Sequence, residues 1–433
     1  MLENIVQTTL DNGLKVICLK KNDTPILSVQ VWYKVGSACE RDGIRGISHF
    51  LEHMMFRGSE RVASEEHAQR INDVGGHCNA FTSEDVTAYV NSVPKDYLDM
   101  VLELEAERMD GLLLDSAILE TERKVIMEEY QTYMNNPVGK SFLEFRKEFF
   151  GTHPYSLSPL GILEDLRNFS QEDCREYYKK WYTPSNASVI VVGDFDDEQK
   201  VFEKVQFHFG SKKRSSTKSG CDIPVPDLTG AHRMKRRVDF DVPILIYGFP
   251  APPSYHEDAL SLEILQIVLS GGETSRLQRE LVRKSSVAVM VGGLNHFLKH
   301  SGMSMFFAAF TPDMSSRKVE KELERQIEHI KIDGITEEEF EKVKFTTLTS
   351  RTFELYSSDN ICQRIGFSET IEGDYRLWVQ RLESLKNLNR DILVETARKY
   401  WDKSNRHILV LKPKKISPML FAAGLLRRLF GHS

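Results

Sequence analysis

Lys180-Trp-Tyr-Thr-Pro-Ser-Asn-Ala-Ser-Val-Ile-Val-Val192 and Lys399-Tyr-Trp-Asp-Lys-Ser-Asn-Arg-His-Ile-Leu-Val-Leu411 repeat one pattern at a single constant offset. Each stretch has two adjacent aromatic residues, a Ser-Asn pair a few positions later, and then a run of mainly apolar residues. This order is typical of a helix end, a turn and a buried strand. Self-similarity at half the chain length indicates a duplicated domain rather than a short-repeat solenoid. The alternative is a chance likeness between two helix–turn–strand units.

The two halves also begin alike. A strand pattern at residues 26–35 precedes a helix pattern at residues 47–57, and a strand pattern at 243–249 precedes a helix pattern at 256–269. These matched openings support the duplication.

The stretch between the halves reads as a linker. Residues 211–220 are rich in Ser, Lys and Gly, and the next ten residues contain two Pro without apolar periodicity. We therefore predict a first domain at 1–210, a linker at 211–232 and a homologous second domain at 233–433.

The order of elements in the first half predicts the fold class. Residues 9–19 and 26–33 are expected to form a hairpin around Lys-Asn-Asp. Long helices are expected at 95–113 and 116–134, and a further strand follows near the end of the half. Strands, then helices, then strands indicate an α+β fold rather than strict βαβ alternation.

The composition is that of a globular protein. The chain has 433 residues, of which 41% are hydrophobic and 28% charged, which excludes disordered, collagen-like and low-complexity classes. The formal net charge is -6, so no global basic field is present and nucleic acid is not an expected partner.

The termini and the cysteines predict the compartment. The N-terminal residues lack the basic and apolar regions of a signal peptide, and the longest terminal apolar run, 419–426, is shorter than the about 20 residues of a membrane span. The six Cys are scattered without a C-x-x-C pair, as expected for buried thiols in a reduced compartment. We therefore expect a cytoplasmic protein without a disulfide framework.

A histidine pair predicts the chemistry. In the helix pattern Gly46-Ile-Ser-His-Phe-Leu-Glu-His-Met-Met-Phe-Arg57, His49 and His53 are four residues apart and lie on one face, and Glu52 falls on the same side. This arrangement offers two nitrogen ligands to one metal, with a carboxylate beside an open position. The alternative is a pair of ordinary surface or core histidines.

A second helix pattern carries two carboxylates toward one face. Glu122 and Glu129 are seven residues apart, about two helical turns, and lie in a stripe with apolar neighbours such as Val125. Buried carboxylates need a cation or a donor, which a metal held by the histidines would provide. Glu128 is expected to face solvent. The alternative is a solvated charged helix.

At this level of detail the chain resembles the pitrilysin/insulinase family of inverted-motif zinc peptidases, which includes mitochondrial processing peptidase. That family has His-x-x-Glu-His, a third ligand that falls on Glu129 when 76 residues are counted from His53, and a Glu seven positions earlier that falls on Glu122. Further matches are Gly75-Gly-His-Cys-Asn-Ala-Phe-Thr-Ser-Glu-Asp-Val-Thr-Ala-Tyr89, His153-Pro-Tyr155, Gly161-Ile-Leu-Glu-Asp165, residues 186–194 and Glu273-Thr-Ser-Arg-Leu-Gln-Arg-Glu280.

The resemblance implies a zinc endopeptidase built from two α/β-roll domains, each a mostly antiparallel sheet covered by helices. It implies one zinc per chain, bound by His49, His53 and Glu129. Glu52 is then the general base for water, and Glu122 orients a ligand histidine. The substrate would be a peptide or an unfolded protein segment.

The resemblance also implies an edge strand at residues 78–81. Extended substrate would add to it as a further strand, with hydrogen bonds at Asn79 and Ala80. The alternative is a simple turn leading into a strand.

The second half lacks the metal residues. Aligned on the first half, it has Leu262, Leu265 and Gln266 at the positions of the motif, and Leu348 at the position of Glu129. One half is therefore expected to be catalytic and its duplicate structural. The competing interpretation of the whole chain is a non-catalytic assembly or peptide-binding subunit.

A second chain is the expected partner. Family peptidases enclose substrate with four homologous domains, and this chain supplies two. Family members hold substrate with an Arg and a Tyr in a C-terminal domain, and alignment places Val282 and Val289 there. A heterodimer is therefore favoured over a homodimer.

The C-terminal tail is basic and amphipathic. Residues 418–430 combine apolar residues with Arg427 and Arg428. The alternatives are packing on the body or a partner, which is favoured, and contact with a membrane surface.

Overall fold

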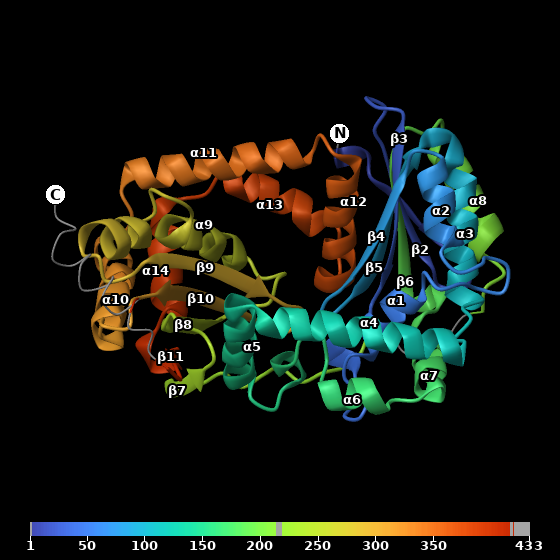
Figure 1. Cartoon of the computed structure of the whole chain (residues 1–433). Coiled ribbons are helices and arrows are strands. Elements are labelled where there is room, and N and C mark those ends of the chain that lie inside the picture. The colour runs from blue at the N-terminus through green and yellow to red at the C-terminus, as the bar shows by residue number, and fades with distance from the viewer. Residues whose placement is uncertain (1, 214–218, 416–418, 420–433) are drawn as a thin grey trace. The chain divides into compact units, whose positions relative to one another are not determined.

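The computed structural model describes residues 2–213, 219–415 and 419 (Figure 1). These residues form two compact units. The first unit draws on residues 2–136, on residues 152–224 outside 214–218, and on 352–380, and the second draws on 137–151, 225–351 and 381–415.

The first unit contains a six-stranded sheet with the order β1-β2-β6-β3-β5-β4. Its strands are β1 (Val6–Thr9), β2 (Lys15–Lys20), β3 (Ile26–Tyr33), β4 (His77–Thr82), β5 (Thr87–Pro94) and β6 (Ala187–Gly193). Its helices are α1 (Ile47–Met54), α2 (Glu66–Asp73), α3 (Leu98–Asp110), α4 (Ser116–Asn135), α6 (Leu163–Asn168), α7 (Gln171–Trp181), α8 (Glu198–Phe209) and α12 (Ser358–Phe367). Helices α3 and α8 cover one face of this sheet, and α12 covers the other (Figure 1).

The expected hairpin at residues 9–19 and 26–33 is wrong. Strand β6 lies between β2 and β3, parallel to the former and antiparallel to the latter. All seven residues of β6 are buried, which is what a central strand requires. The short connection after β2 gives no sign of this insertion, because β6 comes from a distant part of the chain.

The second unit contains a five-stranded sheet with the order β7-β11-β8-β10-β9. Its strands are β7 (His232–Val238), β8 (Ile244–Ala251), β9 (Met290–Phe297), β10 (Gly302–Ala309) and β11 (His407–Pro413). Its helices are α5 (Pro137–Phe150), α9 (Asp258–Ser270), α10 (Ser316–Asp333) and α14 (Arg390–Tyr400), while α11 (Glu337–Glu354) and α13 (Arg376–Lys386) have residues in both units.

The five strands of the second sheet repeat the order and directions of β2-β6-β3-β5-β4 in the first, as the duplication predicts. In the second sheet, β11 lies between a parallel neighbour, β7, and an antiparallel neighbour, β8, just as β6 does in the first. Each of these two central strands follows a short 3-10 turn, Pro184–Asn186 or Lys403–Asn405. The repeated sequence pattern therefore marks the strand that is inserted between two others in each sheet. The mixed α+β class is confirmed.

One covering helix of each unit comes from the other half of the sequence. Helix α12 packs on the first sheet, where a Cβ on Gly366 would lie 2.2 Å from the Trp32 indole. Helix α5 packs on the second sheet, where a Cβ on Gly248 would lie 2.5 Å from the Phe145 ring. At both places glycine lets helix and strand approach closely. The two compact units therefore exchange segments between the halves of the sequence, whereas the predicted domains were separated by a single linker at 211–232.

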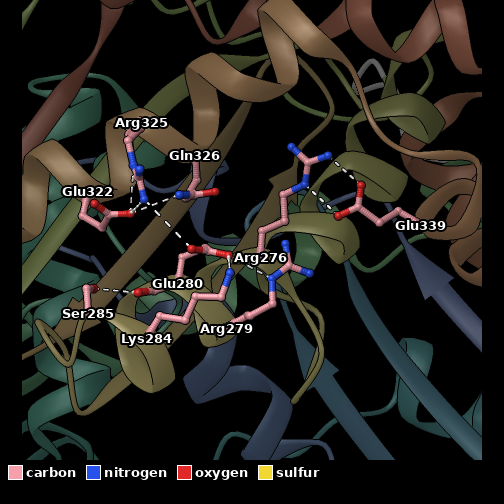
Figure 2. Close-up of polar contacts among 9 residues, drawn as sticks. All are labelled: Arg276, Arg279, Glu280, Lys284, Ser285, Glu322, Arg325, Gln326 and Glu339. Carbon is pink, nitrogen blue, oxygen red and sulfur yellow. Dashed lines mark hydrogen bonds and ion pairs between the residues drawn. The ribbon is translucent and has the colours of Figure 1, made fainter. Parts of the chain in front are cut away.

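The match at residues 273–280 has a structural role in the second unit. Arg276 donates two hydrogen bonds to Glu339 of α11, at 2.8 and 2.6 Å, and Glu280 accepts one from Arg279 at 2.9 Å (Figure 2). Arg276 is largely buried, so its bidentate pair anchors the loop after α9 to α11.

The expectation that all cysteines are free thiols is wrong for one pair. Cys39 and Cys221 form a disulfide, with their Cα atoms 5.4 Å apart across a sequence separation of 182 residues. Cys18, Cys174 and Cys362 are buried thiols as expected. Spacing along the chain cannot reveal a pair that only the fold brings together.

No helix among the described residues combines the length and the apolarity needed to cross a membrane. The predicted amphipathic tail at 418–430 lies, apart from Met419, outside the described residues.

Candidate metal centre

Helix α1 carries the two histidines on one face and packs another face against the hydrophobic core. Phe50, Leu51 and Met54 are fully buried, and the side chains of His49 and His53 lie on a different face of the helix, where they are 12% and 24% exposed. The two imidazole rings lie 4.9 Å apart between centroids, with an interplanar angle of 83°. The spacing of four residues therefore places both rings on one face, as predicted.

A buried carboxylate holds the beginning of this helix. Glu40 accepts hydrogen bonds from the backbone N–H groups of Gly46, at 2.7 Å, and Ser48, at 2.9 Å. Burial raises the pKa of the Glu40 carboxyl to about 7, although these hydrogen bonds oppose the shift. These N–H groups have no partner within the helix, so Glu40 satisfies them and sets the direction of α1.

Glu129 of α4 meets the histidine pair. Its Oε2 lies 3.7 Å from Nε2 of His49 and 3.6 Å from Nε2 of His53. One ligand atom from each of the three residues lies within 4.8 Å of the other two. Tetrahedral zinc with bonds of about 2.0–2.2 Å separates its ligand atoms by roughly 3.3–3.6 Å. The donor set is one that binds zinc, and the two carboxylate–imidazole separations are close to this spacing.

The protonation state of His49 suits a metal ligand. Burial, together with the nearby His53, lowers the pKa of the His49 imidazole to about 4. Its Nδ1 is buried, and no hydrogen-bond partner for it occurs among the described residues. A neutral imidazole is the form that binds a metal.

Glu122 contacts His53 at Nδ1, the ring nitrogen that does not face Glu129. Its Oε2 lies 3.4 Å from Nδ1 of His53, and its Oε1 lies 2.8 Å from Nε of Arg57. The side chain is only 3% exposed, as the sequence predicts. A carboxylate at Nδ1 leaves Nε2 free to face the Glu129 side, which is the arrangement of carboxylate–histidine–metal triads.

The apolar stripe predicted on α4 is only partly present. Glu129 is 48% exposed and Val125 is 43% exposed, so the stripe turns toward solvent after Glu122. The expectation that Glu129 is a buried carboxylate is wrong, although its carboxylate still reaches the histidines.

Glu52 lies beside this group and is held by the sheet. Thr82 of β4 donates a hydrogen bond from Oγ1 to Oε2 of Glu52 at 2.6 Å. Burial raises the pKa of the Glu52 carboxyl to about 7, the Thr82 hydrogen bond opposes this, and the charge of Glu129 adds to it. A carboxyl with its pKa near neutrality can both take and return a proton.

Strand β4 is an edge strand, as predicted, because it is the last strand in the sheet order. The Ala80 N–H does not pair with β5; instead it donates to the side-chain oxygen of Asn79 at 2.8 Å. Asn79 therefore covers a backbone donor that an added strand would use. His77, to which the sequence assigns no role, is an exposed residue of this strand.

Three supporting residues were missed by reasoning from sequence. They are Glu40, Arg57 and Thr82, which contact α1, Glu122 and Glu52 respectively. Thr82 carries the only available signal, since it lies two residues from Ala80 and so faces the same side of β4. The other two contacts depend on how loops and helices meet.

Among the described residues, His49, His53 and Glu129 of the first unit are the one triad arranged to hold a metal. The described part of the second unit has no equivalent group. At the corresponding positions Leu262 and Leu265 are fully buried, and Gln266 donates a hydrogen bond to the Gly293 carbonyl at 2.8 Å. The duplicated helix is thus a core element.

The adjacent carboxylates of α4 provide a test of the helix phase. Glu129→Ala is expected to lower zinc content and any hydrolysis strongly, because it removes the carboxylate that lies against both imidazoles. Glu128→Ala should leave both within a few-fold of the parent, because Glu128 is exposed and outside the triad. Zinc content and peptide hydrolysis measure the difference, and the reverse result would contradict the assignment of Glu129.

Comparisons with known proteins identify the family of this chain. Residues 15–159 match the family described as "Insulinase (Peptidase family M16)", and residues 168–347 match "Peptidase M16 inactive domain". The chain is 31% identical to a protein named zinc protease PqqE of Helicobacter pylori, over 94% of this chain and 92% of that protein. It is 26% identical to the uncharacterized zinc protease YmxG of Bacillus subtilis, over 91% and 95%.

A solved structure shows the same fold. The crystal structure of a protease from Helicobacter pylori superposes with a TM-score of 0.89 at 30% identity, covering 95% of this chain and 100% of that one. The sequence relationship and the shared fold agree, and this chain therefore belongs to the insulinase family of peptidases, peptidase family M16.

Proposed function

We propose that this chain is a zinc-dependent endopeptidase that hydrolyses peptides or unfolded protein segments bound in extended form. The observation that carries the proposal is the convergence of His49, His53 and Glu129 within 4.8 Å, next to Glu52 and one hydrogen bond from the edge strand. Membership of a peptidase family and relatives named zinc proteases support it.

The side chains have distinct roles in this proposal. His49, His53 and Glu129 hold one zinc, and Glu122 orients His53 through Nδ1. Zinc bound by these residues would supply a Lewis acid for the scissile carbonyl and would lower the pKa of the attacking water. Glu52 takes the proton from that water and delivers it to the leaving amine.

Strand β4 joins substrate binding to this chemistry. Backbone groups at Asn79 and Ala80 hold the peptide as an added strand, once the Asn79 side chain releases the Ala80 N–H. Thr82, two residues further on the same strand, holds the Glu52 carboxylate. The substrate and the base are therefore positioned by one element.

Metal content and chelation test the proposal. The purified protein should contain about one zinc per chain and cleave a quenched fluorescent peptide. A chelator should abolish the cleavage, and added zinc should restore it. A protein that binds the peptide but lacks both zinc and hydrolysis would be a peptide-binding subunit, and chelator-resistant hydrolysis would place the chemistry elsewhere.

We further propose that the working enzyme contains a second, related chain. Val282 and Val289 stand where family members hold substrate with Arg and Tyr, and neither valine can donate a side-chain hydrogen bond. A homodimer would therefore lack this pair in both copies, whereas a partner with Arg and Tyr at these positions would supply it.

The partner is tested by reconstitution. The chain alone is expected to hydrolyse peptide weakly, and its nearest two-domain relative from the same genome should raise kcat/KM by tenfold or more, because it adds donors for the substrate. A relative with both donors replaced by Val is the matched control. Full activity of the lone chain, without gain from the relative, would rule out this heterodimer.

A further inference from the structure

An edge strand of the second sheet carries closely spaced cations. Strand β7 is the last strand in the sheet order, and its residues include Arg233, Lys235, Arg236 and Arg237. Arg233 and Arg236 each form an ion pair with a glutamate of a helix that covers the sheet, α10 or α5. Lys235 and Arg237 are exposed, and neither has an ion-pair partner in the described part of the chain. Alternate residues of a strand share a face, so these two uncompensated cations lie on the same side of β7.

The register of the sheet places further lysines beside Arg237. Strand β11 runs parallel to β7 (Figure 1), and its exposed Lys412 is the ladder partner of Arg237. Just beyond β11, the N–H of Lys414 donates to the carbonyl of Val238, the last residue of β7, at 2.9 Å. Like charges at facing positions of neighbouring strands repel each other. The fold therefore gathers these cations against their mutual repulsion.

A carboxylate at the end of β7 shows how many cations converge. Asp239 accepts a hydrogen bond from Nζ of Lys414 at 2.8 Å. This hydrogen bond is the main reason that the pKa of the Asp239 carboxyl lies below its usual value, and the charges of Lys140 and Lys415 lower it further. The connection from β7 to β8 contains one more acid, Asp241. We define the basic surface by six residues, all in the second unit: Lys140, Lys235, Arg237, Lys412, Lys414 and Lys415.

Protection of the sheet edge does not account for the basic surface. Cations on an edge strand prevent it from pairing with other chains, and Lys235 and Arg237 serve that purpose. Lys412 lies on an inner strand and Lys140 lies on α5, so neither of them guards the edge. The chain as a whole carries a net charge of -6, so the local excess of cations does not follow from its composition. An anionic partner surface is the complement of this arrangement.

The sequence that follows Lys415 favours a lipid surface over other polyanions. Residues 416–433 contain Arg427 and Arg428 and no acidic residue. Their large apolar residues are Met419, Leu420, Phe421, Leu425, Leu426, Leu429 and Phe430. Apolar side chains next to cations strengthen binding at a membrane interface, whereas attraction to nucleic acid phosphates gains nothing from them. Packing of these residues on the neighbouring basic surface would instead bring like charges together.

We propose that the basic surface of the second unit docks the protein on an anionic phospholipid membrane. Its cations attract the lipid headgroups, and the apolar residues beyond Lys415 add hydrophobic binding at the interface. Cations that act together on one charged surface reinforce one another, and salt weakens each of them. The inference goes beyond the proposed peptidase function and does not depend on it, because no residue of the metal centre takes part.

Sedimentation with lipid vesicles tests the proposal on the full-length protein. The parent should sediment with vesicles of phosphatidylserine and phosphatidylcholine, but not with vesicles of phosphatidylcholine alone, and added salt should release it. Lys235→Glu combined with Arg237→Glu should lower the affinity for the anionic vesicles about tenfold or more, because two attractive charges become repulsive. Both side chains are exposed and lack ion-pair partners among the described residues, so the fold is expected to survive.

A second charge reversal is the matched control. Arg167→Glu combined with Lys179→Glu changes two exposed cations of the first unit, and it should leave vesicle binding at the parental level. Circular dichroism checks that each variant is folded. Failure of the parent to bind anionic vesicles, equal binding to both kinds of vesicle, or an equal loss in the control would overturn the basic surface as a membrane site.

Two further measurements separate the alternatives. Leu420→Ser combined with Phe421→Ser should weaken vesicle binding without altering its dependence on salt, because it removes apolar contact alone. Binding to double-stranded DNA as tight as to the vesicles, unaffected by this change, would assign the surface to nucleic acid and overturn the membrane proposal. Peptide hydrolysis by the Lys235/Arg237 variant should stay within a few-fold of the parent, so failure of membrane docking and failure of the peptidase proposal are distinguishable.

Discussion

Glu52→Gln is expected to lower kcat for peptide hydrolysis by about 10²- to 10⁴-fold while zinc content stays at the parental level. The substitution removes the group that accepts the proton but keeps the shape of the side chain. The amide oxygen can still accept the Thr82 hydrogen bond, which is 2.6 Å in the parent. The loss therefore reports proton transfer rather than a displaced strand.

The measurements are single-turnover hydrolysis of a quenched peptide and metal analysis of the same preparation. Glu128→Gln is the matched control, since it makes the same chemical change at an exposed position of α4. Activity of Glu52→Gln within a few-fold of the parent would move the base to another residue. Loss of zinc together with activity would instead give Glu52 a role in holding the metal.

His53→Ala is expected to abolish stoichiometric zinc binding and, with it, hydrolysis. The imidazole contacts both carboxylates of the group, Glu129 through Nε2 at 3.6 Å and Glu122 through Nδ1 at 3.4 Å. Its removal leaves two ligands, which is fewer than zinc sites in proteins use. Glu122 retains Arg57 as a partner, at 2.8 Å, so the fold is expected to survive.

Thermal unfolding provides a second readout for this variant. A ligand that binds only the folded state raises its stability, by about 2.7 kcal/mol when its concentration is 100 times Kd. Added zinc should therefore raise the Tm of the metal-free parent but not that of His53→Ala. His208→Ala, which removes a histidine of α8, should respond to zinc like the parent. Full zinc occupancy in His53→Ala would refute the ligand assignment.

Periodicity explains how much of the candidate site can be predicted. His49 and His53 share a face because they are one helical turn apart, and Glu122 and Glu129 share a face because they are two turns apart. These relations are local, so they hold before any tertiary contact forms. The contact between α1 and α4 joins residues far apart in the sequence, so it is predicted by the resemblance to a family and not by periodicity.

Exposure could not be predicted in the same way. Glu122 is buried and Glu129 is half exposed although they lie on one side of one helix. The difference arises because the neighbouring elements cover only part of α4. Thr82 shows the same limit, since its hydrogen bond to Glu52 depends on how β4 passes α1.

The duplication, the α+β class, the histidine pair and the phase of α4 follow from the sequence alone, because each depends on residues within a few turns or on a pattern repeated in both halves. Three features could be seen only in the folded chain: the insertion of β6 between β2 and β3, the Cys39–Cys221 disulfide and the packing of α12 on the first sheet. These features join segments far apart in the chain. Their free energy comes from burying surfaces against one another, which no local pattern of residues records.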